Sequence, residues 1–161
     1  MYLTKNECEN WCRGNGIDLL ALDTEAFKGY EKVETHIPVE CKRQTILIEN
    51  LVELIKGDKE YLVWVRDWPL YRPLQLQLYG DATGRTAVSK TLIDFPGQIV
   101  ISNQIDSLAG MLLLLVAFEW EAYLFSKRNK SIVLISHHCY LSFFSENSLS
   151  VKKAKENFAR G

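Results

Sequence analysis

Apolar positions near the start of the chain recur at helical spacing. Cys8 and Cys12 lie one helical turn apart and place small apolar side chains on one face. Before them, Thr4 and Glu7 have the spacing of a capping box, in which each side chain accepts a hydrogen bond from the other's backbone N–H. The pattern predicts a helix that ends at the glycines of residues 14–16, because glycine readily adopts the left-handed conformation of a helix cap.

The middle of the chain alternates between helical and strand spacing. Residues 17–22 predict a short strand, and Pro38 suits the first turn of a second helix that stops at Gly57. Residues 60–66 alternate with a period of two, which predicts a strand with two apolar faces. Leucines alternate with polar residues over 74–78 as well, which favours another strand, although leucine and glutamine also suit a helix.

The C-terminal half contains a long apolar segment followed by short strand patterns. Residues 108–118 are apolar nearly all round, which predicts a central buried helix. The strands after it are joined by short polar turns such as residues 127–130. The predicted elements are strands at 98–102, 122–126, 131–136 and 140–144, a helix from Asn103 to 118, and a last helix from Ser148 to 158.

This order of elements favours the α+β class. The late connections are too short for parallel crossovers, so the last three strands form an antiparallel meander. We expect a mixed or mostly antiparallel sheet with helices packed on it. A chain of 161 residues is expected to form one domain, over residues 1–161.

Composition and charge exclude some classes of partner. The formal net charge is −1, so nothing attracts the whole chain to nucleic acid or to an anionic membrane. The longest apolar run, 108–118, is shorter than the roughly 20 residues that a spanning helix needs. The polar first residues show no signal peptide, and four cysteines without one suggest reduced thiols in the cytoplasm.

The segment 64–73 has the most unusual composition. Trp, Tyr and Arg dominate the energetics of protein–protein interfaces, because they combine a large contact area with a polar group. The segment concentrates all three types, and its two prolines stiffen it. The alternative is that its tryptophans are core and that Arg66 stacks on one of them. The candidate binding residues are Trp64, Arg66, Trp68, Tyr71 and Arg72.

A thiol site near the end of the late strands is a second candidate. On a strand, His137 and Cys139 would point to the same face, and an imidazole can lower the pKa of a neighbouring thiol. Asp67 or Glu119 could orient the imidazole as the third member of a triad. The alternative is a buried cysteine beside two surface histidines.

Other constellations match no motif closely. Cys8 and Cys12, with the 137–139 cluster, could supply zinc ligands, but the spacing is not that of a known zinc site. Glu119 and Glu121 flank Trp120 and are more typical of solvated acids than of a catalytic pair. The lysines at 152–155 form a small basic face. The sequence therefore predicts no metal, no cofactor and no nucleic-acid partner.

Three functional hypotheses follow from these observations. The first is a non-enzymatic module, adaptor-like or inhibitor-like, that binds another protein through residues 64–73. The second is a small hydrolase or transferase that uses His137 or Cys139. The third is a homo-oligomer, a homodimer for instance, formed through an edge strand or the apolar helix.

Overall fold

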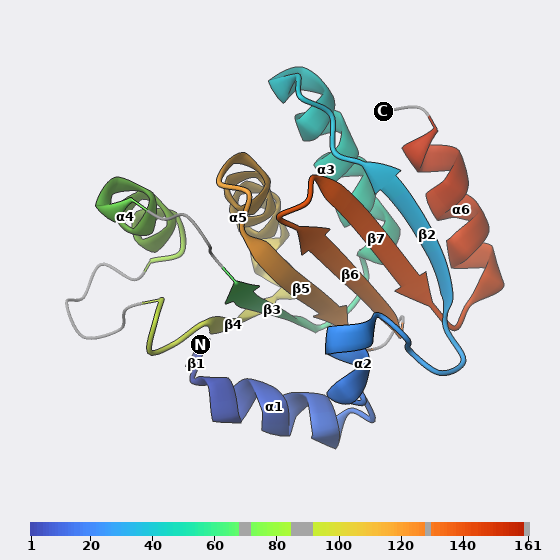
Figure 1. Ribbon diagram of the computed structural model, residues 1–161, viewed down its shortest axis with the longest axis horizontal. Coiled ribbons are helices and arrows are strands. Elements are labelled where there is room, and N and C mark those ends of the chain that lie inside the picture. Colours follow the sequence, from blue (N-terminus) through green and yellow to red (C-terminus); the bar gives the residue numbers. More distant parts are fainter. Residues whose placement is uncertain (68–71, 85–91, 128–129, 160–161) are drawn as a thin grey trace.

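One antiparallel sheet forms the centre of the protein. The computed structural model describes residues 1–67, 72–84, 92–127 and 130–159 (Figure 1). Within these residues seven strands pair in the order β1-β4-β3-β5-β6-β7-β2, and every neighbouring pair is antiparallel. The strands are β1 (Tyr2–Leu3), β2 (Glu31–His36), β3 (Glu60–Asp67), β4 (Gly97–Ile101), β5 (Glu121–Ser126), β6 (Ser131–Ser136) and β7 (Tyr140–Ser145).

Helices cover both faces of the sheet. The two N-terminal helices pack on one face, and four later helices contribute to the core on the other (Figure 1). None of the helices in the described ranges is long and apolar enough to cross a membrane. The helices are α1 (Lys5–Gly14), α2 (Leu20–Thr24), α3 (Cys41–Ile55), α4 (Pro73–Ala82), the short 3₁₀ helix η1 (Ser102–Gln104), α5 (Ile105–Ala117) and α6 (Ser148–Phe158).

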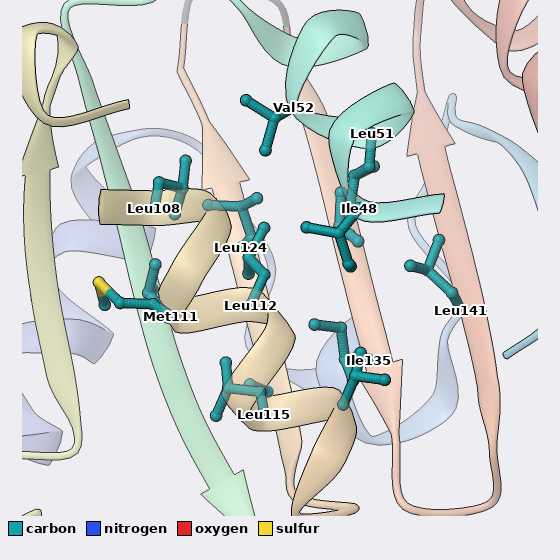
Figure 2. Close-up of a cluster of buried hydrophobic side chains, with 14 of the residues drawn as sticks. Ile48, Leu51, Val52, Leu108, Met111, Leu112, Leu115, Leu124, Ile135 and Leu141 are labelled. Atoms are coloured by element: carbon teal, nitrogen blue, oxygen red, sulfur yellow. The ribbon is translucent and has the colours of Figure 1, made fainter. Parts of the chain in front are cut away.

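The larger core lies between the sheet and the later helices. Apolar side chains of α3 and α5 meet those of β5, β6 and β7 (Figure 2). The sheet contributes to this core from every second position, because successive side chains of a strand point to opposite faces. The labelled contributors are Ile48, Leu51, Val52, Leu108, Met111, Leu112, Leu115, Leu124, Ile135 and Leu141.

The smaller core lies beneath α1 and α2 and is rich in aromatic side chains. Trp64 and Phe125 contribute from the sheet, and Cys8 and Cys12 contribute from α1. The Tyr123 hydroxyl donates a hydrogen bond to the carbonyl oxygen of Leu22, which ties α2 to the sheet. This face of the sheet, with α2 above it, holds the candidate site described below.

The structure confirms the predicted α+β class and most of its elements. Thr4 and Glu7 form the predicted capping box of α1. The strand predicted at 60–66 is β3, and its two faces enter the two separate cores. Strands β5, β6 and β7 form the predicted meander, and α5 packs against the larger core as expected.

Several local predictions are wrong. Residues 17–22 form no strand; the helix α2 begins at Leu20, and it ends at Thr24 because Glu25 is left-handed. Residues 74–78 lie in the helix α4. The edge strand β2 was not expected, because only one of its six residues is buried and its sequence shows no apolar alternation. The last helix is capped by Asn147, not by Ser148 as the sequence predicted.

Candidate binding site

The candidate site begins where the central strand β3 leaves the core. The pairing of β3 with β5 shifts register between Val65 and Asp67, which marks a β-bulge. A bulge bends its strand and changes the direction of the side chains around it. Trp64 is 3% exposed, whereas Arg66 is partly exposed and Asp67 is exposed.

Arg66 is held in place by two contacts. Its Nη2 donates a hydrogen bond of 2.8 Å to Oδ1 of Asp23, at the end of α2. Its guanidinium carbon lies 5.5 Å from the centre of the Trp64 ring, within the range of a cation–π contact. Trp64 is therefore core and Arg66 stacks on it, as the alternative interpretation of this segment predicted.

A polar pocket of about 450 Å³ opens beside these residues. Its volume lies within the roughly 300–1,000 Å³ of ligand pockets in general. Four carboxylates and one guanidinium contribute to its wall, so its lining carries a net negative charge. The lining residues are Leu22, Asp23, Glu25, Arg66, Asp67, Glu121, Tyr123, Leu134, His138 and Tyr140.

Two of the pocket's carboxylates belong to residues that face each other across neighbouring strands. Asp67 of β3 pairs directly with Glu121 of β5. Like charges in directly opposite positions of a sheet repel each other. Glu121 Oε2 lies 3.1 Å from Nδ1 of His137, but Asp67 forms no ion pair with any of the described residues.

Of the pocket's two other acidic groups, Asp23 pairs with Arg66 and Glu25 is fixed by two hydrogen bonds. The Tyr140 hydroxyl donates to its Oε1 at 2.8 Å, and Lys32 Nζ donates to its Oε2 at 2.6 Å. Lys32 also contacts Glu34 at 2.7 Å. Burial alone would lower the pKa of Lys32, but the hydrogen bonds and negative charges of Glu25 and Glu34 raise that pKa overall.

The two histidines and Cys139 lie in the turn that joins β6 to β7. The same-face argument for His137 and Cys139 requires strand geometry, which this turn does not have. Cys139 is exposed with a left-handed φ of 61°. The two imidazole rings lie 4.0 Å apart, and His138 rather than His137 lines the pocket.

The remaining sequence candidates lie elsewhere. Glu119 is exposed between α5 and β5, with a left-handed φ of 55°, and does not line the pocket. Arg72 is exposed at the start of α4. Trp68 and Tyr71 lie outside the described residues. In the described ranges, no group of three or more His, Cys, Asp or Glu side chains is arranged to hold a metal ion.

The structure therefore joins parts of two separate sequence candidates. Arg66 and Asp67 come from the aromatic and arginine-rich segment, and His138 comes from the turn that holds His137 and Cys139. Asp23, Glu25 and Tyr140 were missed, and no local motif marks them.

Comparisons with protein-family models, with curated proteins and with solved structures found no match. The function is consequently inferred from the residues of the pocket.

Proposed function

We propose that this chain is a non-enzymatic protein-binding domain, and that its pocket accepts a lysine or arginine side chain of the partner protein. The observation that supports this proposal is the pair of opposed carboxylates, Asp67 and Glu121. Their repulsion costs folding free energy in the unbound protein. A cationic side chain bound between Asp67 and Glu121 is attracted to both carboxylates and offsets their mutual repulsion.

The rest of the pocket suits this role because its polar groups are already fixed. Arg66 is held by Asp23, so it does not neutralise Asp67. Glu25 is held by Tyr140 and Lys32. Groups that keep one conformation before and after binding lose little conformational entropy, which favours affinity.

The test compares partner capture by three forms of the protein. Immobilised wild type, the isosteric variant Asp67→Asn/Glu121→Gln and the control Glu119→Gln are exposed to lysate, and retained proteins are quantified by mass spectrometry. Removing one partner of a charge pair that binding buries costs about 2–5 kcal/mol, and the double variant removes both carboxylates that would face the cation, so we expect it to lose the partner. The control retains it, because Glu119 does not line the pocket.

A stability measurement separates loss of binding from loss of folding. Asp67→Asn/Glu121→Gln removes the repulsion across the strands, so this double variant should, without its partner, unfold at a denaturant concentration equal to or above that of wild type. Loss of the partner together with unchanged or higher stability supports the proposal. A partner that binds all three forms equally, or no stoichiometric partner at all, contradicts it.

One contact favours the hydrolase or transferase hypothesis as a second candidate. Glu121 Oε2 lies 3.1 Å from His137 Nδ1, on the side from which a carboxylate orients the imidazole of a catalytic triad, although the two atoms do not have hydrogen-bond geometry. If His137 activates Cys139, iodoacetamide should alkylate Cys139 much faster at pH 7 than the exposed Cys41, and His137→Ala should abolish the difference. Equal alkylation rates for the two thiols contradict this candidate.

A further inference from the structure

The strand β2 is an edge of the sheet with an open side. Within the described residues β2 pairs with β7 alone, whereas the opposite edge strand, β1, has only two residues. Edge strands present unpaired backbone groups to which another strand can add. Four of the six β2 residues are exposed to solvent, among them Lys32, Glu34 and His36. The helix α6 packs on both β2 and β7 and lies beside β2 (Figure 1).

The pairing with β7 shows which backbone groups point outward. Ile37, directly after β2, donates its N–H to the carbonyl oxygen of Cys139 at 2.9 Å, in register with the ladder. In an antiparallel pair, hydrogen-bonded and non-hydrogen-bonded positions alternate. The backbone groups of Lys32, Glu34 and His36 therefore point away from β7, toward the open edge.

We propose that a second copy of this chain adds to this edge, antiparallel and related by a twofold axis, so that the two sheets become continuous. Outward-pointing residues must pair with outward-pointing residues, which limits the possible registers to steps of two. One of these places Val33 opposite Val33 of the second copy, and Lys32 opposite Glu34 of the second copy.

Charge selects this register from its neighbours. A shift of two residues one way places Glu34 opposite Glu34 of the second copy, and a shift the other way places Lys32 opposite Lys32. Directly opposed like charges are unfavourable, and opposite charges are favourable. The charged edge thus discourages pairing with unrelated strands but is complementary to itself in one register. This inference does not depend on the partner proposed above.

The backbone geometry provides a register-specific test. In the proposed register Glu31 lies opposite Thr35 of the second copy, as a non-hydrogen-bonded pair with Cα atoms about 4.5 Å apart, which a disulfide can bridge. The background variant Cys41→Ser/Cys139→Ser removes the exposed thiols. Glu31→Cys and Thr35→Cys are then made separately in it, one of them with a mass tag.

We expect an equimolar mixture of the two variants to form a disulfide-linked heterodimer under mild oxidation, while each variant alone stays uncrosslinked. Sedimentation should show that the unmodified protein is a dimer. Glu34→Lys should raise the dissociation constant of this dimer about tenfold or more, since it places a lysine at 34 opposite Lys32 of the second copy. The double variant Lys32→Glu/Glu34→Lys should restore the dimer. A monomer at every soluble concentration, or crosslinking of either cysteine variant alone as readily as the mixture, overturns the proposal.

Discussion

Cys8 Sγ occupies the space into which a side chain on Gly97 would project. A Cβ built on Gly97 would overlap with this sulfur and would also press against Leu3. Gly97 is the first residue of β4 and pairs with both Leu3 of β1 and Trp64 of β3. The missing side chain therefore lets α1 pack directly on the sheet, which seals one end of the smaller core.

The variant Gly97→Ala should be clearly destabilised. Overpacking a filled core commonly costs about 1–3 kcal/mol, and here the neighbours include the backbone of β1 as well as Cys8. Denaturant unfolding followed by circular dichroism measures the loss. Removing the sulfur with Cys8→Ala should make the added methyl group less damaging, so the two changes together should cost less than their sum.

Gly110 provides the matched control. It lies on an exposed position of α5 with nothing near the place of its Cβ. Gly110→Ala should raise the free energy of unfolding by about 0.5–1 kcal/mol, because alanine is the better helix former. A Gly97→Ala variant as stable as wild type would contradict the close approach of Cys8 to β4.

Local sequence patterns predicted those helices and strands that are determined by interactions between residues close together in the chain. The capping box of Thr4 and Glu7 and the two-faced alternation of residues 60–66 act within a few residues, so no tertiary information was needed. The leucines of 74–78 misled because Leu76 packs toward the core while Leu74 and Leu78, one helical turn apart, stay exposed. The sequence of this segment is compatible with both strand spacing and helical spacing, and tertiary contacts decided in favour of the helix.

The pocket could be predicted only in part. Arg66 and Asp67 were among the candidates because the composition around them is unusual. Glu25 and Tyr140 are 115 positions apart and meet only through the fold. The pairing of β2 with β7 and of β3 with β5 determines which loops meet at this end of the sheet, and no short-range pattern encodes strand order.

Ser126 and Asp58 form a buried hydrogen bond whose loss should be measurable. Ser126 Oγ donates to Asp58 Oδ2 at 2.8 Å, and both residues are almost wholly buried. Ser126→Ala removes a donor from a buried carboxylate, which should lower the free energy of unfolding by about 1–3 kcal/mol. Ser107→Ala, on an exposed position of α5, should stay within about 0.5 kcal/mol of wild type. Equal stabilities for the two variants would contradict this role of Ser126.

Leu112 tests whether α5 is as central as its packing indicates. Its side chain is fully buried between α5 and the sheet (Figure 2). Leu112→Ala should cost about 2–5 kcal/mol, because it removes buried apolar surface and leaves a cavity. Leu149→Ala truncates a leucine of α6 that is 61% exposed, so its effect should stay within about 0.5 kcal/mol. Thermal and denaturant unfolding of both variants would show a small difference if α5 were only loosely packed.

Cys12 should make the stability of the protein fall in alkaline solution. Burial on α1 raises the pKa of its thiol from 9.0 to about 12, and the nearby Arg66 offsets only part of that effect. Well below pH 9 the thiol is protonated in both the folded and the unfolded chain, so there it adds no pH dependence. Above pH 9 the unfolded chain loses this proton while the folded chain keeps it. The free energy of unfolding therefore falls by up to about 1.4 kcal/mol per pH unit.

The variant Cys12→Ala isolates this effect. It lacks the titrating thiol, while the tyrosines and lysines that also titrate in this range remain in both proteins. The stability advantage of wild type over Cys12→Ala should therefore be constant from pH 7 to pH 8 and shrink steadily from pH 9 toward pH 11. Parallel stability curves over that range would mean that the thiol ionises as readily in the folded chain as in the unfolded one. Such a result would contradict the burial of Cys12 against the sheet.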